Sequence, residues 1–493
     1  MNASVKSLLE RPSRTKIVAT LGPASDSEEM LEKLIFAGVD VFRINAAHGT
    51  QERFAVMVKR IRSVSKRIGL PVGILMDLAG PKIRLGELEN GELTLESGSE
   101  MAFVSPKFLE KSAGCPDLVG IPCVTCTYEP LVNELRAGDR IVLADGTVEL
   151  TVSQVSAKKN QWAKCRVLDG GTVRSRQGVN LPGVKLSIPA MLEIDRSNAA
   201  WAAKNGVDFL GLSFVRHAFE ITDLKNLIAE NGGTTQVVAK IEKPEALENL
   251  AEIVKETDAV MVARGDLGVE TDIARVAVLQ KEIIQICRAY RRPVIVATQM
   301  LESMTHTNLP TRAEVSDVAN AILDGTDACM LSGESAVGEF PVETVQMMHR
   351  IALGTEDTLE SDFLQFIPET SPIDQTLEIM ARNVCDLAEE LNAKFIVTAT
   401  ANGESARCLS ANRGPARIIA LTPSRDTLQK MCLDWGVIPM ELPKSKKTTK
   451  DIMAFALELL KNENLAVPGD RLILFTDASL GTAQNAIVVY DVK

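Results

Sequence analysis

From Thr15 onward, the chain alternates short runs rich in Val, Ile and Leu with longer stretches that have the period of an amphipathic helix. Short apolar runs of this kind are typical of strands buried on both faces of a parallel sheet. Because parallel strands need a crossover connection, usually a helix, the alternation predicts repeated β-α units. The expected strands are Lys16–Leu21, Val39–Asn45, Val72–Asp77, Val207–Ser213, Gln236–Ile241, Ala259–Ala263, Val294–Thr298 and Ala328–Ser332. This number of strands matches a closed (β/α)8 TIM barrel, and an open doubly wound sheet is the alternative.

The alternation is interrupted between the third and fourth expected strands, from Gly86 to about Asn180. Polar and apolar residues alternate in Gly91–Leu95, which is the period of a strand with one solvated face, and Arg140–Leu143 is a second strand-like run. Gly-containing turn signals separate such runs. We therefore expect an inserted small β-barrel domain. Because this insert leaves the barrel just after a strand's carboxyl end, we expect it to lie over the barrel mouth as a lid that excludes water.

A second α/β alternation begins after about Leu353 and predicts a C-terminal α/β doubly wound domain. Its expected strands are Phe395–Thr400, Ile418–Leu421, Ile438–Leu442 and Leu472–Phe475, with helices such as Asp451–Leu460 between them. The predicted domains are residues 1–85 (first part of the TIM barrel), 86–180 (inserted lid), 181–353 (second part of the barrel) and 354–493 (C-terminal domain).

The net charge of -11 argues against a general nucleic-acid-binding protein, because such proteins need a basic face. The nine cysteines form no disulfide framework, as expected of reduced thiols in a cytosol. Cys123 and Cys126 form a single C-x-x-C, which we interpret as a coincidental loop pair. The segment Met1 to Arg14 lacks the apolar core of a signal peptide, and no apolar run is long enough to span a bilayer. We therefore expect a cytoplasmic protein without nucleic-acid or membrane partners.

Polar side chains follow the carboxyl ends of most of the expected barrel strands. They are Arg43, Asn45, His48, Asp77, Arg84, Ser213, Lys240, Glu242, Asp266, Thr298, Ser332 and Glu334. Taken singly, each has an ordinary structural explanation, such as a residue that ends a strand. Taken together, they predict one site, because a barrel brings the carboxyl ends of all its strands to the same mouth.

The chemical types in this set indicate metal-assisted phosphoryl transfer. Glu242 and Asp266 offer the hard oxygen ligands that Mg²⁺ or Mn²⁺ prefers. Lys240 can neutralise charge on a phosphoryl group, and the guanidinium groups of Arg43 and Arg84 can hold phosphate oxygens. The alternatives are a buried ion pair between Lys240 and a carboxylate, and arginines that only cover apolar surface. Neither a P-loop motif nor a kinase glycine loop is present, so any nucleotide is held by other means.

Several longer runs resemble the pyruvate kinase family. They are Thr15–Ser25, Ala239–Glu242, Met261–Glu270, Ala297–Met304, Pro310–Glu314 and Met330–Glu334, and the likeness extends over nearly the whole chain. The resemblance implies transfer of the phosphoryl group of phosphoenolpyruvate to ADP, giving pyruvate and ATP. It also implies three domains, a divalent metal ion, a second ion that arrives with the nucleotide, and a homotetramer.

The resemblance also assigns roles to individual positions. Lys240 and Arg43 would stabilise the phosphoryl group, and Glu242 and Asp266 would hold the metal ion. Substrate would be bound by Arg43, Ser213, Lys240, Thr298 and the backbone of Ala263, Arg264, Gly265 and Asp266. Thr298, with Ser332 and Glu334 behind it, would form the proton path to the enolate carbon. Pro23, Asn45, His48 and Arg84 would lie near the nucleotide.

Two departures from the family pattern concern the monovalent cation. Potassium-dependent members have a serine at the position of Ala47 and an acidic residue at the position of Lys82. The chain therefore resembles the potassium-independent branch, in which a lysine ammonium replaces K⁺. We expect Lys82 to play this role with Asp77 as its counter-charge, and we expect activity without K⁺. The alternative is that Lys82 is a solvated loop lysine.

A strand-to-helix connection in the C-terminal domain is a possible effector loop. It contains Thr400, Asn402, Gly403 and Ser405, and free amides at a helix start can hold an anion. A plain turn fits these residues equally well. Glu404 stands where relatives regulated by a sugar bisphosphate have an arginine, which argues against fructose bisphosphate as the activator.

Two other functions fit parts of this sequence. One is a different Mg²⁺-dependent barrel enzyme acting on phosphoenolpyruvate or an enolate, such as a carbon–carbon lyase, which would need no nucleotide. The other is a metabolite sensor that has kept the fold but lost catalysis, which is suggested only by Ala46 and Ala47. The presence of Lys240, Glu242 and Asp266 argues against the sensor.

Overall fold

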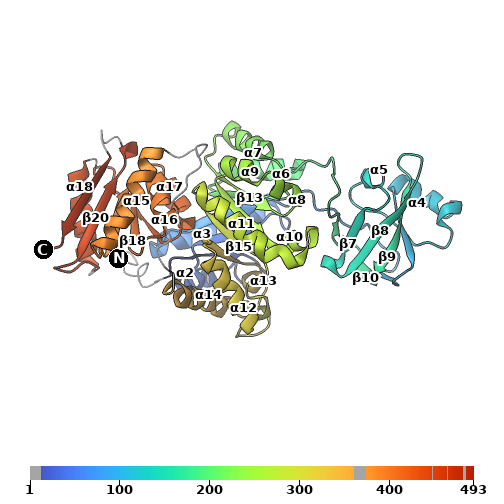
Figure 1. The fold of residues 1–493 in the computed structure, drawn as a ribbon, viewed down its shortest axis with the longest axis horizontal. Helices are drawn as coiled ribbons and strands as arrows, with labels where there is room; N and C mark the ends of the chain where they lie inside the picture. The colour runs from blue at the N-terminus through green and yellow to red at the C-terminus, as the bar shows by residue number, and fades with distance from the viewer. Residues whose placement is uncertain (1–12, 360–373, 447, 464, 481–484) are drawn as a thin grey trace.

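The computed structural model describes residues 13–359, 374–446, 448–463, 465–480 and 485–493. Three bodies follow one another along the long axis, with the C-terminal domain at one end, a barrel in the middle and the insert at the other end (Figure 1). Nearly all of the N-terminal segment that we assessed for a signal peptide lies outside the described residues. Within the described residues, no helix has both the length and the apolar character needed to cross a membrane.

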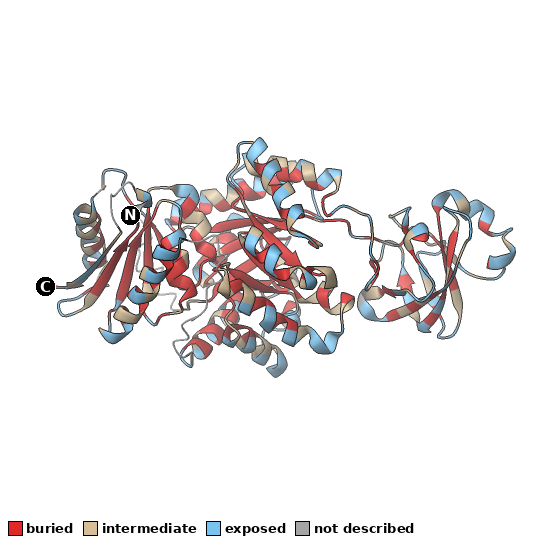
Figure 2. Ribbon diagram, turned by 45° about the horizontal axis from the view of Figure 1, so that its top comes forward, coloured by how far each residue is buried: buried red, intermediate tan, exposed pale blue. Residues whose placement is uncertain are grey.

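The central body is a closed barrel of parallel strands, as predicted, and not an open sheet. Its strands are β1 (Lys16–Thr20), β2 (Val41–Asn45), β3 (Gly73–Asp77), β12 (Phe209–Leu212), β13 (Gln236–Ile241), β14 (Ala259–Ala263), β15 (Val294–Ala297) and β16 (Ala328–Leu331). They pair in the order β1-β16-β15-β14-β13-β12-β3-β2. Nearly every strand residue is buried, because side chains fill the barrel on one face and pack against helices on the other (Figure 2).

Helices surround the barrel and begin and end where the sequence supplies caps. They are α2 (Glu28–Ala37), α3 (Gln51–Ile68), α6 (Glu193–Lys204), α7 (Ala218–Glu230), α8 (Pro244–Glu248), α9 (Leu250–Glu256), α10 (Arg264–Glu270), α11 (Val276–Ala289), α12 (Arg312–Leu323), α13 (Gly333–Ala336) and α14 (Pro341–Glu356). Ser27 Oγ accepts from the amide of Met30, and Thr311 and Glu314 form a capping box. Gly69 ends α3 in the left-handed conformation, with φ of 74°.

The insert is a small all-β domain, as predicted, and its main sheet curls into a half-barrel. Its strands are β4 (Glu92–Leu95), β5 (Glu100–Val104), β6 (Cys123–Val124), β7 (Arg140–Leu143), β8 (Val148–Val155), β9 (Trp162–Asp169), β10 (Gly171–Arg174) and β11 (Val179–Asn180). Six of them pair in the order β11-β7-β8-β9-β5-β6, and β10 pairs with β4. Short helices α4 (Pro106–Ser112) and α5 (Leu131–Glu134) interrupt the sheet pattern, which the alternation of the strands had not indicated.

The C-terminal domain has a five-stranded sheet with helices on both faces. The strands are β17 (Phe395–Ala399), β18 (Arg417–Thr422), β19 (Val437–Glu441), β20 (Arg471–Thr476) and β21 (Ala486–Asp491), in the order β19-β18-β17-β20-β21. The helices include α15 (Gln375–Glu390), α16 (Glu404–Ala411), α17 (Arg425–Lys430) and α18 (Thr449–Asn462). The sequence did not indicate β21, an antiparallel edge strand with partly exposed apolar residues.

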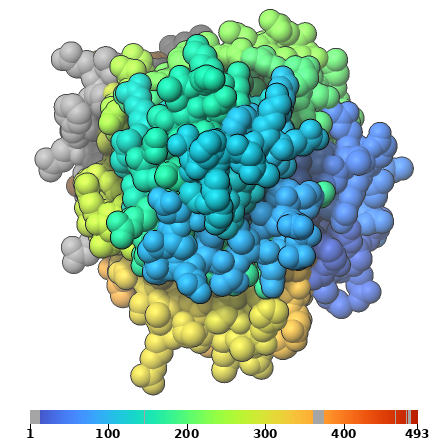
Figure 3. All heavy atoms as spheres, turned by 90° about the vertical axis from the view of Figure 1, so that its right-hand side faces the viewer, coloured from blue at the N-terminus to red at the C-terminus, as the bar shows by residue number. Residues whose placement is uncertain are grey.

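The C-terminal domain packs against the amino ends of the barrel strands. Lys16 Nζ, at the start of β1, donates to the carbonyl of Val437 at 2.8 Å. Cys432 and Leu433 share a buried cluster with barrel residues that include Val18. The carboxyl ends of the strands therefore face the insert, which covers this end of the molecule when it is viewed along the long axis (Figure 3).

A buried carboxyl group at this interface makes a pH-dependent contribution to stability. Asp434 is 2% exposed, and burial raises its pKa to about 6, although Arg407, at 3.7 Å, opposes the shift. The folded state therefore holds this proton between about pH 4 and 6 while the unfolded state has released it, so stability falls as pH rises through this range. At one pKa unit per 1.36 kcal/mol, the loss between pH 4 and 6 is about 2 kcal/mol.

We expect Asp434→Asn to remove this loss, because an amide does not titrate. The thermal unfolding midpoint of the variant, relative to that of the parent chain, should therefore rise as the pH increases from 4 to 6. Asp426→Asn is the matched control, since the Asp426 carboxylate is about half exposed on α17. If the thermal midpoints of both variants change with pH as the midpoint of the parent chain does, Asp434 does not titrate in this range.

Candidate active site

Four side chains at the ends of β2, β3 and β13 form a buried charged cluster. Arg43 contacts Asp77 Oδ2 through Nη2 at 2.6 Å and through Nε at 2.9 Å. Lys240 Nζ lies 3.3 Å from Asp77 Oδ1 and 2.8 Å from Glu242 Oε1. Lys240 also donates to Ser213 Oγ at 2.7 Å. Thus the barrel brings together residues from four separate parts of the chain, as their positions at strand ends predicted.

The cluster keeps Lys240 charged although it is buried. Burial favours the neutral amine, but the adjacent charges of Asp77 and Glu242 outweigh it and raise the lysine pKa. Burial would also raise the pKa of Asp77, and Lys240 and Arg43 reverse this effect and hold it below its usual value. The pKa of Glu242, in contrast to that of Asp77, lies above its usual value. Burial raises it, the ammonium of Lys240 lowers it by a smaller amount, and the negative charge of Asp266 raises it further.

The predicted pairing of Lys82 with Asp77 is wrong. Lys82 Nζ lies 3.5 Å from Asp266 Oδ1, whereas Asp77 is occupied by Arg43 and Lys240. The reason is geometric. Asp77 ends β3 with its side chain in the barrel mouth, and the turn at Gly80, with φ of 65°, carries the following residues away from it. Lys82 is about one-third exposed at the rim.

Glu242 and Asp266 are suitable ligands for a hard divalent cation. Glu242 is fully buried, its Oε2 accepts from the amide of Phe214 at 2.8 Å, and its Oε1 pairs with Lys240 at 2.8 Å. The negative charge of Asp266 contributes to the raised pKa of Glu242. In the described part of the chain, no three acidic, His or Cys side chains gather as a ligand set. Two carboxylates completed by substrate oxygens match the usual protein environment of Mg²⁺.

Thr298 lies beside the first turn of α10, which follows β14 directly. Its Oγ1 accepts from the amide of Gly265 at 2.8 Å and donates to the carbonyl of Ala297 at 2.6 Å. The hydroxyl therefore contacts one of the amides expected to bind substrate. It would have to release that amide for a substrate carboxylate to take its place.

Glu334 lies in the short helix α13, Ser332 is the residue just before that helix, and the Glu334 carboxylate contacts backbone amides. Glu334 is fully buried and accepts from the amides of Leu301, at 3.1 Å, and Ser332, at 2.7 Å. Burial raises the Glu334 pKa, and these amides oppose the shift. No hydrogen bond among the described residues joins Thr298 directly to either side chain.

Arg264 directs its side chain away from the charged cluster. Its guanidinium pairs with Asp317 of α12 at 2.7 Å. Only the backbone of this residue is thus available for the predicted contact with substrate. Asp317 was not among the predicted site residues, because it lies in the middle of an amphipathic helix and follows no strand.

The predicted nucleotide contacts fall into two places. Pro23 and His48 are exposed on loops that follow the adjacent strands β1 and β2, and Asn45 Oδ1 accepts from the amide of Ala47 at 3.1 Å. Arg84 instead lies on the connection to the insert, where Nη1 donates to the carbonyl of Arg176 at 3.2 Å.

The possible effector loop is closed by its own hydrogen bonds. The amide of Gly403 donates to Thr400 Oγ1 at 3.0 Å, and the amide of Glu404 donates to Asn402 Oδ1 at 3.1 Å. Thr398 donates to Ser405 Oγ at 3.0 Å. These contacts are those of an ordinary turn, so an effector here stays a prediction.

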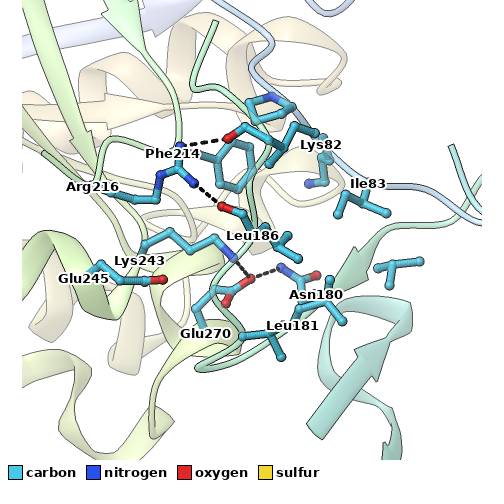
Figure 4. Close-up of a pocket in the computed structure, with 14 residues that line it drawn as sticks. Lys82, Ile83, Asn180, Leu181, Leu186, Phe214, Arg216, Lys243, Glu245 and Glu270 are labelled. Carbon is cyan, nitrogen blue, oxygen red and sulfur yellow. Dashed lines mark hydrogen bonds and ion pairs between the residues drawn. The ribbon is translucent and has the colours of Figure 1, made fainter. Parts of the chain in front are cut away.

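A pocket of about 520 Å³, open solvent included, lies between the barrel and the two segments that lead into and out of the insert (Figure 4). Glu270 joins its two sides, since Oε1 accepts from Asn180 at 3.0 Å and pairs with Lys243 at 2.8 Å. Arg216 donates to the carbonyls of Leu186 and Ile188. These contacts tie the insert to the barrel, and the sequence motifs did not reveal them.

A closed parallel barrel with a lysine, an arginine and carboxylates at its carboxyl ends defines a TIM-barrel enzyme. Two family models match the chain, "Pyruvate kinase, barrel domain" at residues 12–345 and "Pyruvate kinase, alpha/beta domain" at residues 378–490. The chain therefore belongs to the pyruvate kinase family, and by this homology it is a phosphotransferase of that family.

Individual relatives agree with this assignment. The pyruvate kinase of Staphylococcus saprophyticus is 40% identical over 471 residues, which cover 95% of this chain and 78% of that protein. The pyruvate kinase of Staphylococcus epidermidis is 39% identical over 470 residues, with the same coverage. A crystal structure of a pyruvate kinase from Cryptosporidium parvum superposes with a TM-score of 0.89 at 32% identity, covering 99% of this chain and 97% of that one.

Proposed function

We propose that the protein transfers the phosphoryl group of phosphoenolpyruvate to ADP, giving pyruvate and ATP. The observation that carries this proposal is the buried Lys240, which stays charged between Asp77 and Glu242 and lies next to the pair of possible metal ligands. A carbon–carbon lyase would use a similar metal site but no nucleotide. The family assignment favours the kinase.

Glu242 and Asp266 would hold the Mg²⁺ or Mn²⁺ ion. When bound, the ion would supply positive charge to the oxygens of the substrate phosphate and carboxylate. Glu242 suits this role because its position is fixed by the amide of Phe214 at 2.8 Å.

Lys240 and Arg43 would act on the phosphoryl group in transfer. Both are cations held in place by Asp77, and Ser213 Oγ fixes the Lys240 ammonium at 2.7 Å. Preorganised charges of this kind stabilise developing charge without reorganisation during the reaction. The backbone amides from Ala263 to Asp266 would receive the substrate carboxylate.

We propose that Thr298 delivers the proton to the enolate carbon, with Ser332 and Glu334 supporting its loop. Glu334 suits this supporting role because it is buried and accepts from the amides of Leu301 and Ser332. Pro23, Asn45, His48 and Arg84 would lie near ADP. For Arg84, this role requires the insert to approach the barrel mouth.

We also propose that the enzyme needs no K⁺. The support is Lys82, whose ammonium lies 3.5 Å from Asp266 and thus places a fixed positive charge beside a proposed metal ligand.

We further propose a cytoplasmic homotetramer, as the family suggests. Light scattering of the purified protein would test the assembly.

The function is tested by measuring pyruvate formed from phosphoenolpyruvate and Mg²⁺, with and without ADP. We expect pyruvate and ATP in equal amounts, and only when ADP is present. Pyruvate without ADP would favour the lyase, and binding of phosphoenolpyruvate without turnover would favour the sensor. Adding fructose bisphosphate should change the rate little, since Glu404 would repel its phosphate.

A further inference from the structure

Thr298 of the proposed active site and the residue after it, Gln299, both have left-handed backbone conformations. Thr298 has φ of 71° and Gln299 has φ of 54°. Residues other than Gly rarely adopt this region, and for a β-branched residue such as Thr it is a real outlier. Such a conformation persists only where the surrounding contacts determine it.

The contacts come from Arg264. Its Nη2 donates to the carbonyls of Thr298 at 2.9 Å and Gln299 at 3.3 Å, so one guanidinium is hydrogen-bonded to both residues with left-handed conformations. The same guanidinium pairs with both oxygens of Asp317, each at 2.7 Å. The Arg264 side chain is 10% exposed, and the bidentate pair fixes its orientation.

The conformation of the Thr298–Gln299 turn sets the position of the Thr298 hydroxyl. Thr298 Oγ1 lies 2.8 Å from the amide of Gly265, which is the residue next to Arg264. Release of the turn would therefore move the hydroxyl relative to the amides that would bind substrate. A displacement of about 1 Å at a reacting group can cost on the order of 100-fold in rate.

We infer that Arg264 and Asp317 are positioning residues that hold the Thr298–Gln299 turn, and thereby place the Thr298 hydroxyl for proton transfer. This inference rests on the proposed role of Thr298. The inference distinguishes phosphoryl transfer from protonation of the enolate. The phosphoryl group would be stabilised by Lys240 and Arg43, and the Arg264–Asp317 pair contacts neither of them. Loss of the pair should therefore impair protonation more than phosphoryl transfer.

Asp317→Asn and Arg264→Lys test this inference. The rate of proton transfer is read from exchange of the pyruvate methyl protons with deuterated water, by NMR, in the presence of enzyme, Mg²⁺ and ATP. Phosphoryl transfer is read separately from the quenched-flow yield of ATP. We expect exchange to fall about 10- to 100-fold in both variants, with a much smaller change in phosphoryl transfer. Asp324→Asn, at the end of the same helix, is the matched control.

Gln299→Gly provides the rescue. Glycine adopts positive φ without steric cost, so the turn should no longer need the pair. In the Asp317→Asn background, Gln299→Gly should restore much of the lost exchange. Equal losses in both half-reactions together with no rescue would overturn the inference and leave Asp317 a merely structural residue.

A crystal structure of Asp317→Asn separates failure of this inference from failure of the proposed function. We expect Thr298 to leave the left-handed region, or its hydroxyl to lose the Gly265 amide. An unchanged turn would overturn the inference, whatever reaction the enzyme catalyses. In contrast, absence of pyruvate formation by the parent chain would refute the proposed function alone.

Discussion

Lys240→Ala is expected to lower kcat for pyruvate formation by about 10³-fold or more, the scale on which phosphoryl-transfer enzymes lose activity when a cation at the transferring group is removed. The Lys240 ammonium lies within 3.3 Å of two buried carboxylates, so its loss leaves Asp77 and Glu242 without their shared cation. Stability should fall as well, which makes a comparison of thermal midpoints part of the experiment. Lys240→Arg keeps the charge and should be the better folded of the two variants.

Lys243→Ala is the matched control for this prediction. Lys243 is also mostly buried and pairs with a carboxylate, Glu270, at 2.8 Å, but it lies in the pocket beside the insert. We expect its kcat to stay within about tenfold of the parent value, since no charge at the proposed phosphoryl site is lost. A Lys240→Ala enzyme that works as well as Lys243→Ala would refute the role of Lys240.

Lys82→Glu is expected to lower the rate in K⁺-free buffer by about 10²-fold or more, because it replaces a cation beside Asp266 with a carboxylate. The substitution restores the acidic residue of potassium-dependent relatives. Combined with Ala47→Ser, which supplies the missing hydroxyl, it should make the enzyme responsive to added K⁺. The measurement is pyruvate formation in buffers free of K⁺ and NH₄⁺, before and after adding K⁺.

Lys185→Glu makes the same change of charge at an exposed position between the insert and the barrel. We expect it to change neither the rate nor the response to K⁺ by more than about twofold, because exposed charges are strongly screened. The prediction for Lys82 would be contradicted if the parent enzyme itself required K⁺, or if the Lys82 and Lys185 variants behaved alike.

The barrel was predictable because burial leaves a strong local signal in the sequence. A strand enclosed on both faces must be apolar throughout, as in Ala259–Ala263, and the polar residue that follows marks its end. The site followed from the same logic, because parallel strands in a barrel share one mouth. Thus Arg43, Lys240 and Glu242 were placed together without any knowledge of distances.

The less regular parts of the molecule were less predictable. The edge strand β21 is partly exposed and pairs on one side only, so its sequence carries a weak pattern. The insert bends into an open curled sheet with short helices, which depends on long-range strand pairing and not on local alternation. Asp317 lies on a helix and follows no strand end, so no motif pointed to its contact with Arg264.

The sequence by itself determined the order of the elements, the barrel and the set of charged residues at its mouth, because these depend on local hydrophobic period and on strand polarity. The choice of partners among those charges was decided only by the tertiary structure. Asp77 pairs with Arg43 and Lys240 and not with Lys82, and Lys82 pairs with Asp266. Several carboxylates and cations lie near one another at the mouth, and only the directions of the side chains and of the turn at Gly80 decide which of them meet.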